Sequence, residues 1–144
     1  MEPTLYLLDT DIISDLMRHP TGSAAHHVAE RARQNKAHGM VTSVIVQCEL
    51  LFGMRRLTSP RWQQQYRSVM DGLEVLPLAP EASETYAALR ARLEAAGTPI
   101  GANDTLIAAH ALSLGATLVS GDAEFHRVPG LRLENWLQPI ATRP

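Results

Sequence analysis

Several things are scarce in this chain of 144 residues. It has a single cysteine, Cys48, which rules out a disulfide within the chain. We therefore expect reducing, cytoplasmic surroundings. No stretch approaches the roughly 18 consecutive apolar residues of a membrane-spanning helix, so no membrane partner is expected. The first residues lack a basic region and soon reach Asp9, which argues against a secretory signal.

Positive charge is also scarce, and lysine is nearly absent. The net charge is −2, which argues against a strongly basic protein that binds nucleic acid without regard to sequence. Twelve of the 13 basic residues are arginine, and Lys36 is the single lysine. Arginine favours specific contacts to phosphate or carboxylate because its guanidinium is planar. An arginine-rich codon composition would explain this bias equally well.

The patterns that are present predict an α/β fold in one domain, residues 1–144. Short apolar runs alternate with helical patterns, which is typical of a mainly parallel sheet. Asp11 is expected to cap the first helix, Ser43 the third, and glycines at 97 and 115 end two others. The expected strands cover residues 5–8, 39–42, 74–78, 117–119 and 131–133, and the expected helices cover 12–18, 21–35, 44 onward, 60–71, 80–96 and 103–114.

One acid, Glu49, stands inside the otherwise apolar run VIVQCELLF. No Lys or Arg lies within four residues of it, so no neighbouring turn of the expected helix offers a partner. A buried carboxylate without a partner costs several kcal/mol or becomes protonated. A structural role explains Glu49 poorly, because in the middle of a helix it caps nothing.

Three further acids border apolar elements. Asp9 closes the first strand, Asp104 opens the last long helix, and Asp122 follows the strand at 117–119. The carboxyl ends of parallel strands and the first turns of the following helices meet at one edge, where ligands usually bind. Each acid also has a structural reading, because Asp9 and Asp122 can cap turns and the helix dipole favours an acid at 104. The set of four is more specific than any one of them.

Clustered carboxylates repel each other unless a cation neutralises them. Mg²⁺ and Mn²⁺ prefer oxygen ligands and leave coordination positions open for phosphate oxygens. Such a site can activate water for attack on a phosphodiester. The acids therefore indicate a metal-dependent hydrolase that acts on phosphate esters.

Four stretches resemble the PIN-domain endoribonucleases, and more closely the VapC-type toxins of bacterial toxin–antitoxin pairs. They are LLDTDIIS, CELLFG, NDTLIAAHAL and VSGDAEFHRVPGLRLENW, in the order and spacing of the family. The resemblance implies a three-layer α/β/α sandwich with a mainly parallel sheet. It also implies Mg²⁺- or Mn²⁺-dependent cleavage of RNA, such as tRNA, by a toxin that a cognate antitoxin neutralises.

The resemblance also assigns roles to residues. Asp9, Glu49 and Asp104 match the first three acids of the family. Asp122 is preferred as the fourth acid and Glu124 is held in reserve, because this stretch is shorter than in many relatives. As metal ligands the resemblance implies Asp9 and Asp104, with Glu49 and Asp122 binding directly or through water. Asp11, Asn103 and Ser120 are expected to support the ligands.

Members of this group commonly form homodimers and bind an antitoxin whose tail lies across the active-site groove. Apolar residues between positions 44 and 70 would suit either surface: Leu57, Trp62, Tyr66 and Met70. Packing in the core explains most of them at least as well.

Two other classes of protein share some of these features. Asp9 and Asp11 after an apolar strand also open haloacid-dehalogenase-like phosphatases, but those enzymes need a late lysine, and Lys36 lies too early. A non-catalytic module of the PIN type that only binds RNA or protein is the other alternative. The six histidines are expected to be structural or solvent-facing, and none forms a shared site by spacing.

Overall fold

The computed structural model describes residues 4–34 and 39–140. Its centre is a sheet of five parallel strands in the order β3-β2-β1-β4-β5. In the middle strand, Leu7 pairs with Val41 on one side and Leu118 on the other. All three are buried. The strands are β1 (Leu5–Leu8), β2 (Gly39–Ser43), β3 (Glu74–Leu76), β4 (Thr117–Val119) and β5 (Arg132–Glu134).

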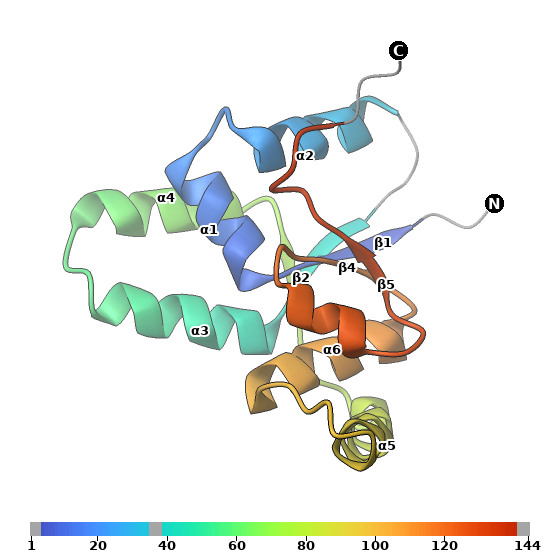
Figure 1. The fold of residues 1–144 in the computed structure, drawn as a ribbon. Coiled ribbons are helices and arrows are strands. Elements are labelled where there is room, and N and C mark those ends of the chain that lie inside the picture. The colour runs from blue at the N-terminus through green and yellow to red at the C-terminus, as the bar shows by residue number, and fades with distance from the viewer. Residues whose placement is uncertain (1–3, 35–38, 141–144) are drawn as a thin grey trace.

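Helices cover both faces of the sheet (Figure 1). In that view α2 lies above the sheet while α5 and α6 lie below it. This confirms the expected three-layer α/β/α sandwich. The helices are α1 (Thr10–Arg18), α2 (Ser23–Arg33), α3 (Val44–Arg55), α4 (Pro60–Met70), α5 (Glu81–Ala95) and α6 (Ala102–Leu114), and η1 (Ala123–Arg127) is a short 3₁₀ helix.

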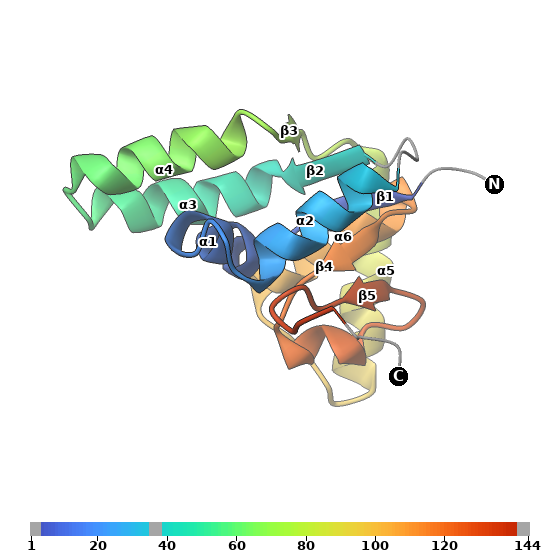
Figure 2. The ribbon, with the colours of Figure 1, turned by 90° about the horizontal axis from the view of Figure 1, so that it is seen from above.

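Two helices extend beyond the sheet. Helices α3 and α4 run side by side, away from the end of β2, in both ribbon views (Figure 2). We call residues 44–70 the arm. Of its expected surface residues, Leu57 is exposed, whereas Trp62, Tyr66 and Met70 are partly buried against the core. Three of these four side chains therefore pack against the core, as the alternative explanation expected.

The helix ends follow from local chemistry, with one correction. The Ser43 hydroxyl accepts a hydrogen bond from the Ile45 N–H at 3.1 Å, so it caps α3 as expected. Gly115 ends α6 with a φ of +65°, a conformation that suits glycine. Asp11 does not cap α1, because the helix already begins at Thr10, with Asp9 as the preceding residue. Asp11 instead lies in the first turn, where its carboxylate is free to bond elsewhere.

Other element ends differ from the expectation by a few residues. Helix α2 starts at Ser23 rather than at 21, and Asn35 lies outside the described residues. The segment η1 was not expected, since a single 3₁₀ turn shows no periodicity in a sequence. Among the described histidines, His27 and His110 are buried while those at 19, 26 and 126 are exposed, and His38 lies outside the described residues. Within residues 4–34 and 39–140, no helix is both long and apolar enough to cross a membrane.

Candidate active site

The site lies at the switch point in strand order, where successive strands are added on one side of β1 and then on the other. Strands β1 and β4 are neighbours, and the residues that follow them are Asp9 and Ser120. The Ser120 hydroxyl donates to Asp9 Oδ2 at 2.8 Å, and both residues are buried. The Ser120 oxygen also accepts from the Asp122 N–H at 3.0 Å. This serine therefore joins Asp9 to the segment that carries the next acid.

Asp11 lies beside Asp9 and reaches the same loop. Its Oδ2 accepts a hydrogen bond from the Gly121 N–H at 2.8 Å. Its other oxygen, Oδ1, is buried and has no hydrogen-bond partner among the described residues. A buried carboxylate oxygen without a partner is costly, and a further hydrogen-bond donor or a cation would offset that cost.

Glu49 approaches from the arm. The Thr10 hydroxyl donates to its Oε1 at 2.9 Å, which ties α3 to the start of α1. Glu49 is only partly buried, and its neighbours Val46 and Leu50 carry the buried face of α3. The acid is thus not a misplaced core residue. It lies at the border between the apolar helix face and the acidic edge.

The densest group of acids involves Asp104, Asp122 and Glu124. One carboxylate oxygen from each lies within 4.8 Å of the other two. Asp104 comes from the first turn of α6. The Asp122 Oδ1 accepts from the Glu124 N–H at 2.9 Å, which starts η1 and brings Glu124 beside the other two acids. Both candidates for the fourth acid, Asp122 and Glu124, therefore lie next to Asp104.

Asp9 and Glu49 are neighbours of this group rather than members of it. Asp104 interacts electrostatically with Glu49, and Asp9 interacts with Asp104. All four acids named from the sequence thus lie at one edge. Of the residues expected to support them, Ser120 and Asp11 bond within the site, whereas Asn103 is exposed beside Asp104.

Burial and repulsion hold two of these acids partly protonated near neutral pH. Burial raises the pKa of Asp9 to about 7, opposed by the Ser120 hydrogen bond and assisted by the charges of Asp11 and Asp104. The pKa of Asp104 rises to about 6, first through burial and then through nearby Asp122 and other acids. Burial likewise raises the pKa of Asp11. The site is therefore short of positive charge.

Little within the protein offsets this negative charge. Among the described residues, the one ion pair at the cluster joins Arg127 to Glu124, at 3.9 Å and with both side chains about half exposed. An exposed pair at that distance contributes little. The atoms that face each other in the cluster are all carboxylate oxygens, the ligand type that Mg²⁺ and Mn²⁺ prefer. The acidic cluster thus fits a divalent metal ion.

Two contributors to the site were not expected from the sequence. Thr10 orients Glu49, and Gly121 bonds Asp11 through its backbone. A Cβ atom at position 121 would lie 2.5 Å from a Leu137 side-chain carbon and 3.0 Å from Asp11 Oδ2, so a larger residue would force both side chains to shift. Their positions inside D-T-D and S-G-D were the available signals, since each residue has at least one acid next to it.

Comparison with known proteins gives consistent matches. The model of the PIN domain family matches residues 6–131. The chain is 35% identical over 135 residues to ribonuclease VapC2 of Rickettsia felis, which covers 92% of this chain and 98% of the relative. It is 34% identical over 115 residues to the tRNA(fMet)-specific endonuclease VapC of Salmonella typhimurium, covering 76% of this chain and 84% of that protein.

Solved structures agree with the sequence matches. VapBC2 of Rickettsia felis, bound to a DNA fragment from its promoter, is similar with a TM-score of 0.85 and 31% identity, covering 92% of this chain and 99% of that one. VapBC-1 of nontypeable Haemophilus influenzae is similar with a TM-score of 0.77 and 32% identity, covering 94% of this chain and 100% of that chain.

Proposed function

Because the chain belongs to the PIN-domain family, and within it to the VapC ribonucleases, we propose that it is an endoribonuclease toxin. Its substrate is RNA, and its reaction is hydrolysis of phosphodiester bonds. The observation that carries the chemistry is the gathering of Asp104, Asp122 and Glu124, with Asp9 and Glu49 beside them, at one edge of the sheet. Purely structural carboxylates would be expected to pair with cations instead.

The proposed cofactor is Mg²⁺ or Mn²⁺. Asp104, Asp122 and Glu124 would hold it most directly, with Asp9 contributing from its position beside Asp104. When bound, the ion supplies positive charge that stabilises the phosphate as it is attacked. Neutralising the cluster would also lower the raised pKa values of Asp9 and Asp104 and return both groups to their charged forms.

The chain's own residues then orient the reaction. Ser120 occupies one oxygen of Asp9 and so fixes the direction in which the other points. Thr10 holds Oε1 of Glu49, which leaves Oε2 to accept a proton from the attacking water. We therefore assign the metal-ligand positions to the four acids named above and proton transfer to Glu49. The hydrogen bonds set both orientations before RNA arrives.

The proposed biological setting follows from the relatives. The similar solved structures are VapBC toxin–antitoxin complexes, so the proposed protein partner is a cognate antitoxin. We also propose a homodimer and a cytoplasmic location. An antitoxin that covers the acidic edge would keep the nuclease inactive until it is removed.

The test uses purified protein free of antitoxin. It is incubated with pools of tRNA and mRNA, with Mg²⁺, with Mn²⁺ and with EDTA. We expect site-specific cleavage with either ion and none in EDTA. Unchanged cleavage in EDTA would remove the metal from the mechanism. RNA binding without cleavage under every condition would instead favour a non-catalytic module.

A further inference from the structure

The arm carries a charge opposite to that of the site beside it. Residues 50–70 contain four arginines and no aspartate or glutamate, a net charge of +4. The whole chain has a net charge of −2, so the remainder carries −6. An RNA strand that approaches the acids meets repulsion, whereas the adjoining arm attracts it. The four arginines are Arg55, Arg56, Arg61 and Arg67.

These four guanidinium groups are free to bind an anion. All are exposed, and within the part of the chain that the structure describes none takes part in an ion pair, a side-chain hydrogen bond or a ring contact. Of the seven other arginines that the structure describes, four have an acidic partner, as Arg31 has in Glu134 and Arg90 has in Glu94. Arg18 lies over the Trp62 ring and Arg132 donates to the Gly115 carbonyl oxygen. Among the described residues, Arg92 on α5 is thus the one unpaired arginine outside the arm.

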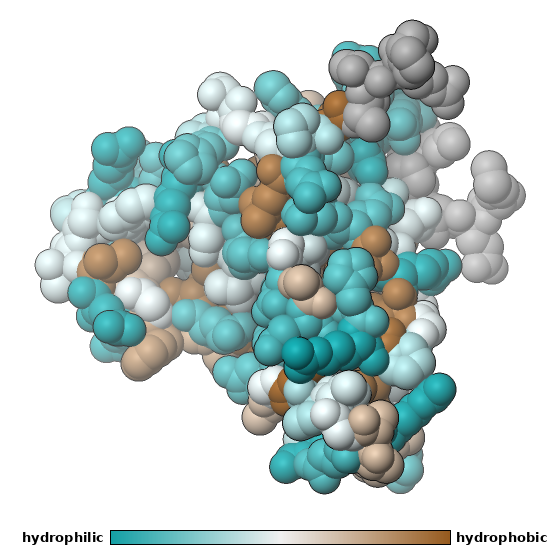
Figure 3. Space-filling view, in the orientation of Figure 1, coloured by the Kyte–Doolittle hydropathy of each residue, from teal (hydrophilic) through white to brown (hydrophobic). Residues whose placement is uncertain are grey.

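A hollow of about 480 Å³ lies between the outer parts of α3 and α4. No carboxylate lines it, and its wall combines guanidinium groups, hydroxyls, an amide, one aromatic ring and apolar carbon. Phosphates bind guanidinium groups, while unpaired bases stack on aromatic and apolar side chains. Figure 3 shows brown apolar side chains mixed with polar ones over the arm. The lining residues are Leu51, Met54, Arg55, Leu57, Thr58, Gln63, Tyr66 and Arg67.

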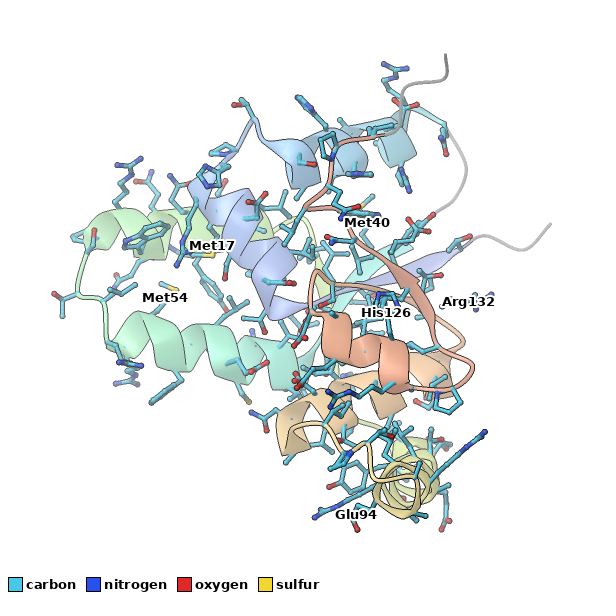
Figure 4. All side chains as sticks on the ribbon, in the orientation of Figure 1. Met17, Met40, Met54, Glu94, His126 and Arg132 are labelled. Carbon is cyan, nitrogen blue, oxygen red and sulfur yellow. The ribbon has the colours of Figure 1, made fainter. Side chains whose placement is uncertain are left out.

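A second hollow connects the first one to the acids. It has a volume of about 160 Å³, shares Met54 and Leu57 with the larger hollow, and reaches Thr10 and Glu49. Figure 4 shows Met54 in the space between α3 and α4. Along α3, Arg55 lies six positions after Glu49, which is about 9 Å of helix. A short stretch of single-stranded RNA can span that distance.

We propose that the hollow of the arm binds the RNA substrate next to the bond that is cut. Arg55 and Arg67 hold a backbone phosphate, and Tyr66 packs against a base. The scissile phosphate lies at the acids while the neighbouring nucleotides follow the two hollows along α3. This inference rests on the proposed ribonuclease function and assigns its substrate-binding surface. The absence of any acid in the hollow favours the polyanion RNA over a protein segment.

The test measures RNA binding separately from cleavage. A labelled single-stranded RNA oligonucleotide is titrated with Asp104→Asn protein in Mg²⁺ at several salt concentrations. The double substitution Arg55→Ala with Arg67→Ala is compared with Arg92→Ala, an exposed and unpaired arginine outside the arm. We expect the double variant to reduce the slope of log affinity against log salt by about 0.7, because the two arginines hold one phosphate and each phosphate contact on a single strand contributes about 0.7. Arg92→Ala should leave the slope unchanged.

A third variant separates charge from geometry. Arg55→Lys with Arg67→Lys keeps the positive charge and should retain most of the salt slope, although it loses the paired hydrogen bonds of guanidinium. Cleavage by proteins with an intact Asp104 should show a raised KM in the double alanine variant and a nearly unchanged kcat. Equal melting temperatures of all variants would show that the fold is intact.

The outcomes divide clearly. Wild-type affinity and slope in the double alanine variant overturn the proposal. If the double alanine variant binds RNA like the wild-type protein but binds a co-expressed antitoxin more weakly, the hollow binds a protein instead, and the proposal is overturned. If the wild-type protein cleaves no RNA while its RNA binding depends on Arg55 and Arg67, the proposed nuclease activity fails and this binding surface stands.

Discussion

The molecule has two charged clusters, one in which opposite charges are paired and one in which like charges face each other. In the first, Arg31 donates to Glu134 Oε1 at 2.8 Å and its guanidinium stacks over Trp136 at 5.2 Å. Trp136 also donates to the same oxygen at 2.9 Å. In the second, at the ends of β1 and β4, acids face other acids and two of their pKa values are raised.

The difference separates stabilising charge from functional charge. The Arg31 cluster is neutral as a pair and joins α2 to the edge strand β5 across 103 positions of sequence. The acidic cluster carries an excess of one sign and leaves the buried Asp11 Oδ1 without a partner. Repelling groups reduce stability, and enzymes retain them where the chemistry needs them. Substitutions in the two clusters should therefore have opposite consequences.

The largest expected effect is on cleavage, from Asp104→Asn. Removing this carboxylate takes away a proposed metal ligand, so kcat should fall by roughly 10²–10⁴-fold. The melting temperature in EDTA should stay equal or rise, because one repelling charge is gone. RNA cleavage kinetics and thermal melts check the two halves. Wild-type kcat in this variant would exclude Asp104 from the site.

A control and a metal readout accompany that prediction. Glu84→Gln removes an exposed acid from the first turn of α5, outside the site; it should leave kcat unchanged and should not raise the melting temperature. Adding Mg²⁺ at pH 7.5 should raise the melting temperature of the wild-type protein, since a ligand that binds the folded state stabilises it. Asp104→Asn should reduce that rise. An equal rise in both proteins would locate the ion elsewhere.

The next effect is on the pH dependence of stability without metal. Folding raises the pKa of Asp9 to about 7, so the folded state holds this proton more tightly than the unfolded chain does. The free energy of unfolding should therefore fall as pH rises from about 4 to about 7, by roughly 2–4 kcal/mol for this group. Denaturant titrations of wild-type and Asp9→Asn proteins in EDTA isolate its share. Parallel profiles would contradict the assignment.

In the paired cluster, Arg31→Ala should reduce stability and leave cleavage intact. The substitution leaves the partly buried Glu134 without its cation and removes the stacking on Trp136. We expect a loss of about 1–3 kcal/mol in the free energy of unfolding. Arg33→Ala on the same helix is the matched control, because its pair with Glu30 is exposed and is worth less than about 1 kcal/mol. Equal losses would contradict the comparison.

The smallest expected effect concerns the cap of α3. Ser43→Ala removes the acceptor for the Ile45 N–H and also the 2.8 Å hydrogen bond between Ser43 Oγ and His110 Nδ1. Burial lowers the pKa of His110, which favours its neutral form. The loss should be about 1 kcal/mol, and somewhat more if His110 finds no other partner. Ser59→Ala is the control, since Ser59 precedes α4 but its side chain makes no capping bond. A denaturant midpoint lowered equally by both would refute the distinction.

Much of the architecture was predictable because its signals are local. The apolar runs of β1 and β4, the serine before α3 and the glycine after α6 each report their own element. The expected position of Asp11 as a cap was wrong, since α1 begins earlier than its apolar pattern suggests. The turn η1 was missed because five residues are too few for a period.

The site likewise has features that the sequence predicted and features that it did not. That Asp9, Glu49, Asp104 and Asp122 belong together could be argued from the sequence, because parallel strands end at a common edge. That Glu124 joins Asp104 could not, because this depends on the turn that Asp122 starts. The contacts of Thr10 with Glu49 and of Gly121 with Asp11 join distant segments, so no local pattern announces them.

The sequence by itself therefore determined the order of strands and helices along the chain, the family resemblance and the choice of acids proposed for the site. Periodicity and short motifs encode these features within a few residues. The tertiary structure alone decided which oxygens face each other, which acids are buried enough to hold protons near neutral pH, and where unpaired arginines meet a hollow beside them. Those properties depend on distances between segments up to 111 residues apart, and only the packed sheet and helices set such distances.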